Sequence, residues 1–139
     1  MLRGLSTVTY LADDVAAATD WYTQLLGVEP YFARSVEGTP AYAEYRIGDY
    51  QHELGILSRR FAAPPGQSSE SGGATVYWHV DDVHASFERL LALGASACEQ
   101  PVERGPGFIT ASVIDPFGNL LGVMYNQHYL DVLASRPGA

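Results

Sequence analysis

The chain has 139 residues, 47% of them hydrophobic and 17% charged, which is typical of one packed globular domain. Its formal net charge of −8 repels phosphates, so nucleic acids and anionic membrane surfaces are excluded as expected partners. No apolar run approaches the roughly 20 residues of a membrane-spanning helix, and the start of the chain lacks the apolar stretch of a signal peptide. The single cysteine, Cys98, cannot form an internal disulfide, which favours a cytoplasmic location.

The first part of the chain predicts a strand, a helix and three further strands. A β-pattern covers residues 5–12. Apolar residues then recur at helical spacing between Asp14, a good N-cap, and Gly27, which ends the helix. Turn-forming residues at 37–40 and 48–49 separate three strand-like runs, at residues 30–36, 42–47 and 51–57.

The second part predicts the same order after an exposed connector rich in Pro, Gly and Ser. The predicted elements are a strand at 75–80, a helix at 83–93, and strands at 96–103, 108–114 and 119–125. The sequence Asp115-Pro116-Phe117-Gly118-Asn119 predicts a hairpin turn between the last two strands, because Pro fixes φ at one position and Gly tolerates positive φ at another. One short helix is expected in the tail.

A long internal repeat supports this organisation. The segment Thr7–Ala17 returns as Thr75–Ala85, 68 residues later, with six identical positions. A period of this kind indicates a repeated supersecondary unit. The predicted single domain, 1–139, therefore contains a first module, a connector, a second module and a C-terminal tail, at residues 5–57, 58–73, 74–126 and 127–139.

The order of elements, with Asp14-Val15, Trp21-Tyr22 and Leu26-Gly27 early and the Asp-Pro-Phe-Gly-Asn turn late, resembles the glyoxalase / bleomycin-resistance / extradiol-dioxygenase superfamily. The resemblance implies the vicinal oxygen chelate fold, an α+β architecture. Two tandem βαβββ modules with curved, mostly antiparallel sheets would form a cup that holds a divalent metal or an organic ligand. It also implies frequent dimerisation, so a homodimer is among the expectations.

The resemblance places four metal-ligand positions on Thr7, Glu53, Thr75 and Gly122. Only Glu53 is an ordinary metal ligand, because threonine is a poor neutral ligand and glycine has no side chain. A second alignment, of Leu54-Gly55-Ile56-Leu57 with Leu121-Gly122-Val123-Met124, sets Gly55 opposite Gly122 and still aims Glu53 at the same face. We therefore expect neither a metal nor another cofactor.

Strand alternation and the repeat together predict the wall of the cup. Glu53 and His79 are its titratable members and the candidate catalytic residues, and His79 is the expected partner of the Glu53 carboxylate. The remaining candidates would contact the ligand: Thr7, Thr9, Thr75, Tyr77, Leu120, Gly122 and Met124. Arg46 is expected to pair with Glu44 or Asp49 at the surface.

Three functions are compatible with this sequence. The leading hypothesis is a protein that binds a small organic molecule in the cup between its modules, without the standard metal quartet. The alternative is a divalent-metal-dependent lyase or dioxygenase with a shifted site that uses Glu53 and His79. The third is an interaction or structural module whose cup is filled by its own side chains.

Overall fold

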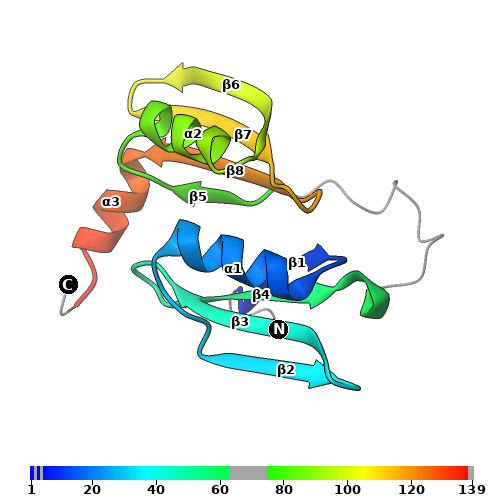
Figure 1. Cartoon of the computed structure of the whole chain (residues 1–139). Helices are drawn as coiled ribbons and strands as arrows, with labels where there is room; N and C mark the ends of the chain where they lie inside the picture. The colour runs from blue at the N-terminus through cyan, green and yellow to red at the C-terminus, as the bar shows by residue number, and fades with distance from the viewer. Residues whose placement is uncertain (2, 4, 63–74, 138–139) are drawn as a thin grey trace. The chain divides into compact units, whose positions relative to one another are not determined.

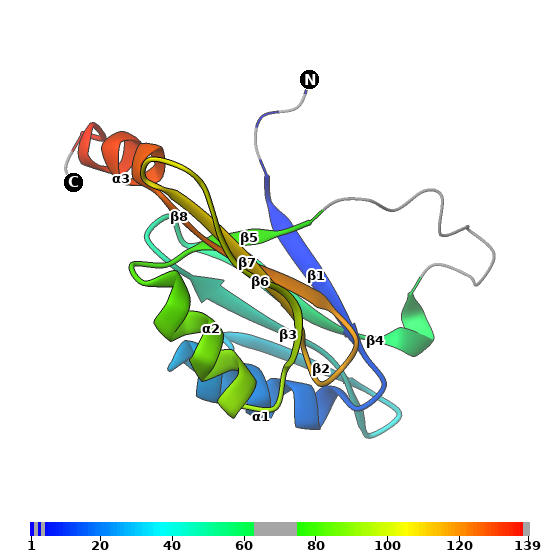
Figure 2. The same ribbon diagram turned by 90° about the horizontal axis from the view of Figure 1, so that it is seen from above.

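The structure is a computed structural model, and it describes residues 1, 3, 5–62 and 75–137. The chain divides into two compact units, residues 1–72 and 73–139. Each unit contains one four-stranded sheet and one helix that runs along a face of that sheet (Figures 1 and 2). Among the described residues, no helix is both long and apolar enough to cross a membrane.

The sheet of the first unit has the strand order β1-β4-β3-β2. β1 pairs with β4 in parallel, whereas β4 with β3 and β3 with β2 are antiparallel. The elements are β1 (Thr7–Ala12), α1 (Val15–Leu26), β2 (Phe32–Val36), β3 (Thr39–Ile47), β4 (His52–Ser58) and a 3-10 turn η1 (Arg59–Phe61). The predicted order of strand, helix and three strands is therefore confirmed for this half.

The ends of α1 follow from its sequence. The Asp14 carboxylate accepts a hydrogen bond from the backbone N–H of Ala17 at 3.0 Å, so it caps a donor that the first turn leaves unpaired. Gly27 adopts the left-handed conformation, with φ of 72°, and its N–H bonds to the Thr23 carbonyl. Both predicted end signals are confirmed.

α1 covers the face of the first sheet that carries the apolar core. Tyr10, Tyr45 and Ile56 are fully or almost fully buried on that face, and Tyr22 of the helix packs against Tyr10 with ring centroids 5.9 Å apart. The buried phenol of Tyr45 donates to the Thr19 carbonyl at 2.8 Å and lies 2.9 Å from the Thr23 hydroxyl. Burial raises the pKa of Tyr45 above its ordinary value.

Replacing Tyr45 with phenylalanine is expected to lower the free energy of unfolding by about 1 kcal/mol at neutral pH, because a buried hydrogen-bonded hydroxyl is lost. The raised pKa means that the unfolded state ionises first, so wild-type stability falls as pH rises above about 10 and towards the folded-state value. The stability of the Tyr45→Phe variant does not fall in this way, because phenylalanine does not ionise. Urea unfolding of both proteins across this range should show the difference narrowing, and a constant difference would contradict the assignment.

The second unit repeats the arrangement, with strand order β5-β8-β7-β6. β5 pairs with β8 in parallel, and the other two pairs are antiparallel. Asp82 caps α2 through the N–H of Ala85, as Asp14 caps α1. The elements are β5 (Tyr77–His79), α2 (Val83–Ala92), β6 (Ser96–Gly105), β7 (Phe108–Ile114), β8 (Leu120–Asn126) and α3 (Gln127–Ala134).

Several predicted boundaries need correction. Residues 39 and 40 belong to β3 and not to a turn, because Glu37 and Gly38, with φ of 52° and 77°, complete a two-residue hairpin between Val36 and Thr39. The predicted connector begins with the last residue of β4 and with η1, and its remainder from 63 to 73 lies outside the described residues. β5 begins at Tyr77, so Thr75 precedes the strand.

Candidate functional site

Each sheet has one face that is not covered by the helix of its own unit, called here the helix-free face. In the first sheet the ladder places Thr7 beside Glu53 and Glu53 beside Arg46. The next row along the same face contains Thr9, Gly55 and Glu44. Since side chains alternate along a strand, these rows lie opposite the buried residues that contact α1. These two rows of the helix-free face are therefore mostly polar, whereas the third row, Leu11, Leu57 and Tyr42, is apolar and aromatic.

Glu53 has two partners on this face. The Thr7 hydroxyl donates to Glu53 Oε2 at 2.6 Å, and Arg46 Nη1 lies 3.1 Å from Glu53 Oε1. The side chains of Arg46 and Glu53 are 48% and 23% exposed, so the pair is partly solvated and contributes at most about 1 kcal/mol to stability. Arg46 was expected to pair with Glu44 or Asp49; the ion pair found here is with Glu53, and the charge of Arg46 also acts on Glu44.

These contacts decide whether Glu53 suits a divalent metal. A metal bound to its carboxylate would stand next to the guanidinium of Arg46, which already supplies the positive charge. The described part of the chain contains no group of three His, Cys, Asp or Glu residues that could hold a metal ion. The donor set around Glu53 therefore does not fit the metal centre that the resemblance implies.

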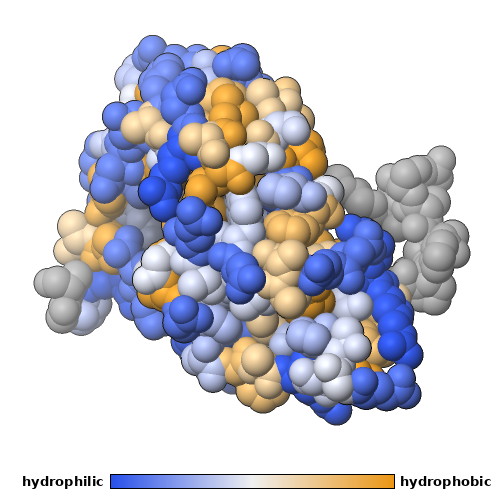
Figure 3. Space-filling model, in the orientation of Figure 1, coloured by the Kyte–Doolittle hydropathy of each residue, from blue (hydrophilic) through white to orange (hydrophobic). Residues whose placement is uncertain are grey.

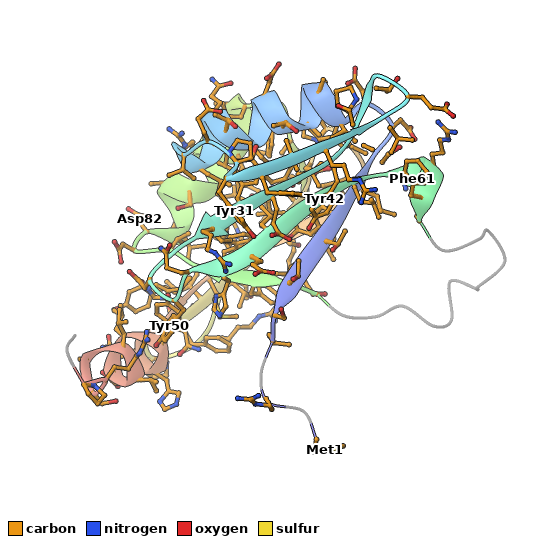
Figure 4. The ribbon with its side chains drawn as sticks, turned by 90° about the horizontal axis from the view of Figure 1, so that it is seen from below. Met1, Tyr31, Tyr42, Tyr50, Phe61 and Asp82 are labelled. Carbon is orange, nitrogen blue, oxygen red and sulfur yellow. The ribbon has the colours of Figure 1, made fainter. Side chains whose placement is uncertain are left out.

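The carboxylate of a second residue, Glu44, accepts hydrogen bonds from two tyrosine hydroxyls. Tyr42 donates to Glu44 Oε1 at 2.5 Å, and Tyr31 donates to Oε2. Burial raises the pKa of the Glu44 carboxyl above its ordinary value and the charge of Glu53 adds to the shift, whereas Arg46 opposes it. Figure 4 labels both tyrosines on this sheet. Nothing in the sequence pattern marks Glu44 as part of a candidate site.

The ladders establish which positions of the two sheets are equivalent. Thr9 pairs with Gly55 in the first sheet, and Tyr77 pairs with Gly122 in the second. Gly55 is thus the counterpart of Gly122, as the second alignment predicts. Two residues earlier, the counterpart of Glu53 is Leu120, whose hydrocarbon side chain cannot ligate a metal.

His79 is mostly buried on the second sheet, with 8% of its side chain exposed. Its ring stacks on Tyr129 of α3, with centroids 4.4 Å apart and planes inclined by 9°. Nδ1 accepts the backbone N–H of Asn126 at 3.3 Å, so a neutral ring carries its proton on Nε2. Nε2 is buried without a hydrogen-bond partner among the described residues, and the nearest carboxylate oxygen, of Asp81, is 3.8 Å away.

Replacing His79 with alanine is expected to loosen α3, because the stacked pair contributes about 1 kcal/mol beyond its buried area. Amide hydrogen exchange in residues 127–134 should become faster, while exchange in the first unit stays unchanged. Tyr129→Ala should give the same pattern. Unchanged exchange of α3 in both variants would show that the stack does not hold the helix.

The structure places most of the predicted contact residues on the two helix-free faces. In the first unit it brings Glu53 and Thr7 together, with Thr9 in the adjacent row. In the second unit the ladder rows hold Tyr77 beside Gly122 and His79 beside Met124, and Leu120 lies on the same face as Gly122. The partners found for Glu53 are Thr7 and Arg46, and those found for His79 are Tyr129 and Asn126.

A cavity of about 220 Å³ lies elsewhere in the first unit, where the carboxyl end of β4 meets the β2–β3 hairpin. Arg60 and Phe61 contribute to its wall, and the guanidinium of Arg60 lies 5.2 Å from the centre of the Phe61 ring. None of the predicted site residues lines it. The complete lining is Asp13, Val36, Thr39, Pro40, Ala41, Ser58, Arg60 and Phe61.

Comparison with known proteins supports the predicted architecture. The model of the Glyoxalase/Bleomycin resistance protein/Dioxygenase superfamily matches residues 4–123. The predicted α+β fold of two βαβββ modules is confirmed by this match and by the two four-stranded sheets. A search of the curated proteins found no match.

Solved structures with the same fold include three whose functions are named. A glyoxalase-related enzyme from Fulvimarina pelagi has a TM-score of 0.69 and 20% identity, covering 91% of this chain and 90% of that one. A lactoylglutathione lyase from Agrobacterium tumefaciens has a TM-score of 0.65 and 18% identity, covering 93% and 98%. The fosfomycin resistance protein FosX from Listeria monocytogenes has a TM-score of 0.65 and 17% identity, covering 91% and 92%. These identities establish similarity of fold alone.

Proposed function

The chain belongs to the Glyoxalase/Bleomycin resistance protein/Dioxygenase superfamily, and from this premise we propose that it binds a small organic molecule without the metal quartet. The binding residues are those of the helix-free faces. The observation that carries the proposal is the pairing of Glu53 with Arg46 and Thr7. Glu53 is the one residue of a metal-binding type at the four expected positions, and its carboxylate is thereby paired with a cation and a hydroxyl of the protein itself.

The chemistry of the two faces favours an organic ligand. Thr7 and Thr9 offer exposed hydroxyls, and the Glu53–Arg46 pair offers both a hydrogen-bond acceptor and a donor. In the second unit, taken by itself, Tyr77 and Met124 offer apolar surface. In the first unit the polar groups lie on the same sheet as the Tyr42 ring, and a few polar groups beside an aromatic side chain are typical of small-molecule sites.

FosX is an example of this fold holding a small organic molecule together with a metal. That protein was solved in complex with manganese(II) and 1S,2S-dihydroxypropylphosphonic acid, a small organic molecule. A metal in this chain would require donors beyond Glu53. The ladder neighbour of Glu53 in β1 is Thr7 and its counterpart in the second sheet is Leu120, and neither is an ordinary metal ligand. Binding and sequestration of an organic molecule requires none of these donors. A location in the cytoplasm and assembly as a homodimer remain predictions from the sequence.

Elemental analysis of untagged protein, purified without chelators, tests this proposal. The expected result is no stoichiometric divalent metal, both as purified and after incubation with zinc, nickel, manganese or iron(II) followed by desalting. About one ion per chain would contradict it and would favour the metal-dependent lyase or dioxygenase. Glu53→Gln and His79→Ala would then lose that ion if the shifted site exists, whereas His84→Ala, on the exposed side of α2, would retain it.

A small-molecule screen by thermal shift tests the binding itself. Ligands that bind the folded state raise the unfolding temperature, so several stabilising compounds are expected from a diverse library. If no compound stabilises the protein, the result would contradict binding and would favour an interaction or structural module. A filled site predicts that outcome, because bulky side chains would leave no space for a ligand.

A further inference from the structure

One feature is common to the helix-free faces of both sheets: a tyrosine ring lies directly over a central-strand glycine. A Cβ atom added at Gly55 would lie 2.5 Å from Oη and 2.9 Å from Cε1 of Tyr42. A Cβ atom added at Gly122 would lie 2.6 Å from Cδ1 and 2.8 Å from Cε1 of Tyr77. Any other residue at either position would displace the ring that covers it.

The backbone does not explain these glycines. Neither Gly55 nor Gly122 has a positive φ, so both conformations are open to any residue. Glycine inside a strand costs about 0.5–1 kcal/mol relative to alanine, through the extra freedom of the unfolded chain. The space left for the Tyr42 ring is therefore the physical reason for glycine at position 55, and the space left for the Tyr77 ring and the Val76 carbonyl is the reason at position 122.

The two units reach this arrangement with unrelated tyrosines. Gly55 and Gly122 occupy equivalent ladder positions, but Tyr42 comes from the antiparallel neighbour β3, whereas Tyr77 comes from the parallel neighbour β5. The residue at the ladder position of Tyr77 in the first unit is Thr9. Duplication of one ancestral tyrosine therefore does not account for both rings. The same arrangement of a tyrosine ring over a strand glycine, called here a tyrosine platform, occurs in both units.

Each ring lies against its glycine and keeps part of its surface exposed to solvent. The ring of Phe32 lies beside that of Tyr42, with centroids 6.3 Å apart and planes inclined by 59°. Tyr77 is 39% exposed and Tyr42 is half-buried. The hydrogen bond of Tyr42 to Glu44 at 2.5 Å fixes the orientation of its ring. An aromatic ring held in place in this way is pre-organised for contact with a planar ligand, since little side-chain entropy is lost when the ligand binds.

We propose that Tyr42 and Tyr77 are stacking surfaces for a planar aromatic ligand that carries a hydroxyl or similar hydrogen-bonding group. The inference rests on the proposed function and specifies its ligand class. In the first unit, Thr9 adjoins Gly55 in the ladder, and its exposed hydroxyl lies in the row beneath Tyr42. A flat aromatic ring system is complementary in shape to the tyrosine rings, and the hydroxyl of the ligand can form hydrogen bonds with the polar side chains of that row.

A matched pair of probes separates stacking from simple hydrophobic binding. The probes are 2-naphthol and its saturated analogue decahydro-2-naphthol, which have the same carbon skeleton and the same hydroxyl. Titrations of the full chain are followed by NMR, with tyrosine ring protons observed. We expect 2-naphthol to bind about three- to tenfold more tightly than the saturated analogue, because stacking adds to burial. Ring-current shifts should appear at Tyr42 or Tyr77.

Variants of the two tyrosines complete the test. Tyr42→Phe and Tyr77→Phe keep the rings and should retain the preference for 2-naphthol, whereas Tyr42→Leu or Tyr77→Leu should remove it at the affected unit. Tyr50→Leu is the matched control, because Tyr50 stacks on His52 with centroids 5.7 Å apart and does not cover either glycine. Circular dichroism confirms that each variant is folded before titration.

The outcomes distinguish the two proposals. Equal affinity for both probes, or an unchanged preference in both leucine variants, would overturn stacking while leaving small-molecule binding intact. If neither probe binds, stacking is also overturned, and the library screen then decides the proposed function separately. Hits restricted to non-aromatic compounds would support the proposed function alone, and no hits at all would remove both.

Discussion

Replacing Asp115 with alanine is expected to lower the free energy of unfolding by about 3 kcal/mol, because the carboxylate organises the turn between β7 and β8. Asp115 is 3% exposed, and its Oδ1 accepts the backbone N–H groups of Phe117 and Asn119 at 2.9 and 2.8 Å. Oδ2 accepts the side-chain amide of Asn119 at 3.0 Å. Alanine leaves these part-buried donors without their acceptor.

Asparagine at the same position is the matched control. Its single carbonyl oxygen can still accept both backbone N–H groups, since both bonds go to Oδ1, and only the bond through Oδ2 is lost. Asp115→Asn should therefore cost about 1 kcal/mol, roughly a third of the alanine effect. Chemical denaturation with fluorescence detection measures both variants. Equal losses in the two variants would show that the charge, and not the set of backbone contacts, stabilises the turn.

Gly55 and Gly122, the glycines beneath the two tyrosine rings, should differ in how much stability is lost when each is replaced by alanine. At Gly122 the added Cβ meets Tyr77 and also the backbone carbonyl oxygen of Val76, at 2.9 Å. At Gly55 the close atoms all belong to the side chain of Tyr42. Since a side chain can rotate away more easily than a backbone can move, Gly122→Ala should cost about 2–3 kcal/mol and Gly55→Ala about 1 kcal/mol.

Double variants test this explanation. Tyr42→Ala should remove the clash at position 55 completely, so the alanine substitution there becomes nearly neutral when it is combined with Tyr42→Ala. Tyr77→Ala should relieve the clash at Gly122 only in part, because the Val76 carbonyl remains. Thermal and urea unfolding of single and double variants give the coupling energies. Full rescue at position 122, or no rescue at position 55, would contradict the contact geometry.

The repeat made most of the fold predictable from the sequence. Asp14 caps α1 as predicted, Asp82 caps α2 at the equivalent position of the repeat, and Gly27 ends α1 in the left-handed conformation. These signals are local, so they depend on neighbouring residues alone. The hairpin at 115–119 was also predictable, because Gly118 has a positive φ of 91° there.

The candidate site was only partly predictable, because it depends on strand register. A two-residue turn at Gly48-Asp49 would place Glu44 opposite Glu53. The observed loop includes Gln51, with φ of 54°, and pairs Ile47 with His52, so the register shifts by two residues. Arg46 therefore faces Glu53. Positive φ in a non-glycine residue has no strong sequence signal, so the register that brings Arg46 to Glu53 is not evident from the sequence.

The pairing of His79 was missed for a different reason. Strand alternation correctly predicts which face of β5 the imidazole occupies, but its partner Tyr129 lies on α3, beyond the repeat. After β4 the residues that the structure describes form only the short turn η1, so the repeat carries no information about this contact. Alternation gives the face of a strand, whereas a contact to a non-repeated element requires the structure.

The scattered apolar side chains visible on the surface lie among polar ones (Figure 3). Exposed apolar residues distributed in this way are ordinary on soluble proteins, so they do not themselves define a ligand site. Ligand binding is supported instead by the hydrogen bond and ion pair that join Glu53 to Thr7 and Arg46, and by the two tyrosine rings that lie over glycines.

The most direct test of a metal-independent organic ligand is a calorimetric titration of the best compound from the screen, in the presence and absence of a chelator. We expect saturable binding with the same dissociation constant in both conditions. The basis is that Glu53 is engaged by Arg46 and that its ladder counterpart is Leu120. Binding that disappears with the chelator and returns when a divalent metal is added would contradict this account.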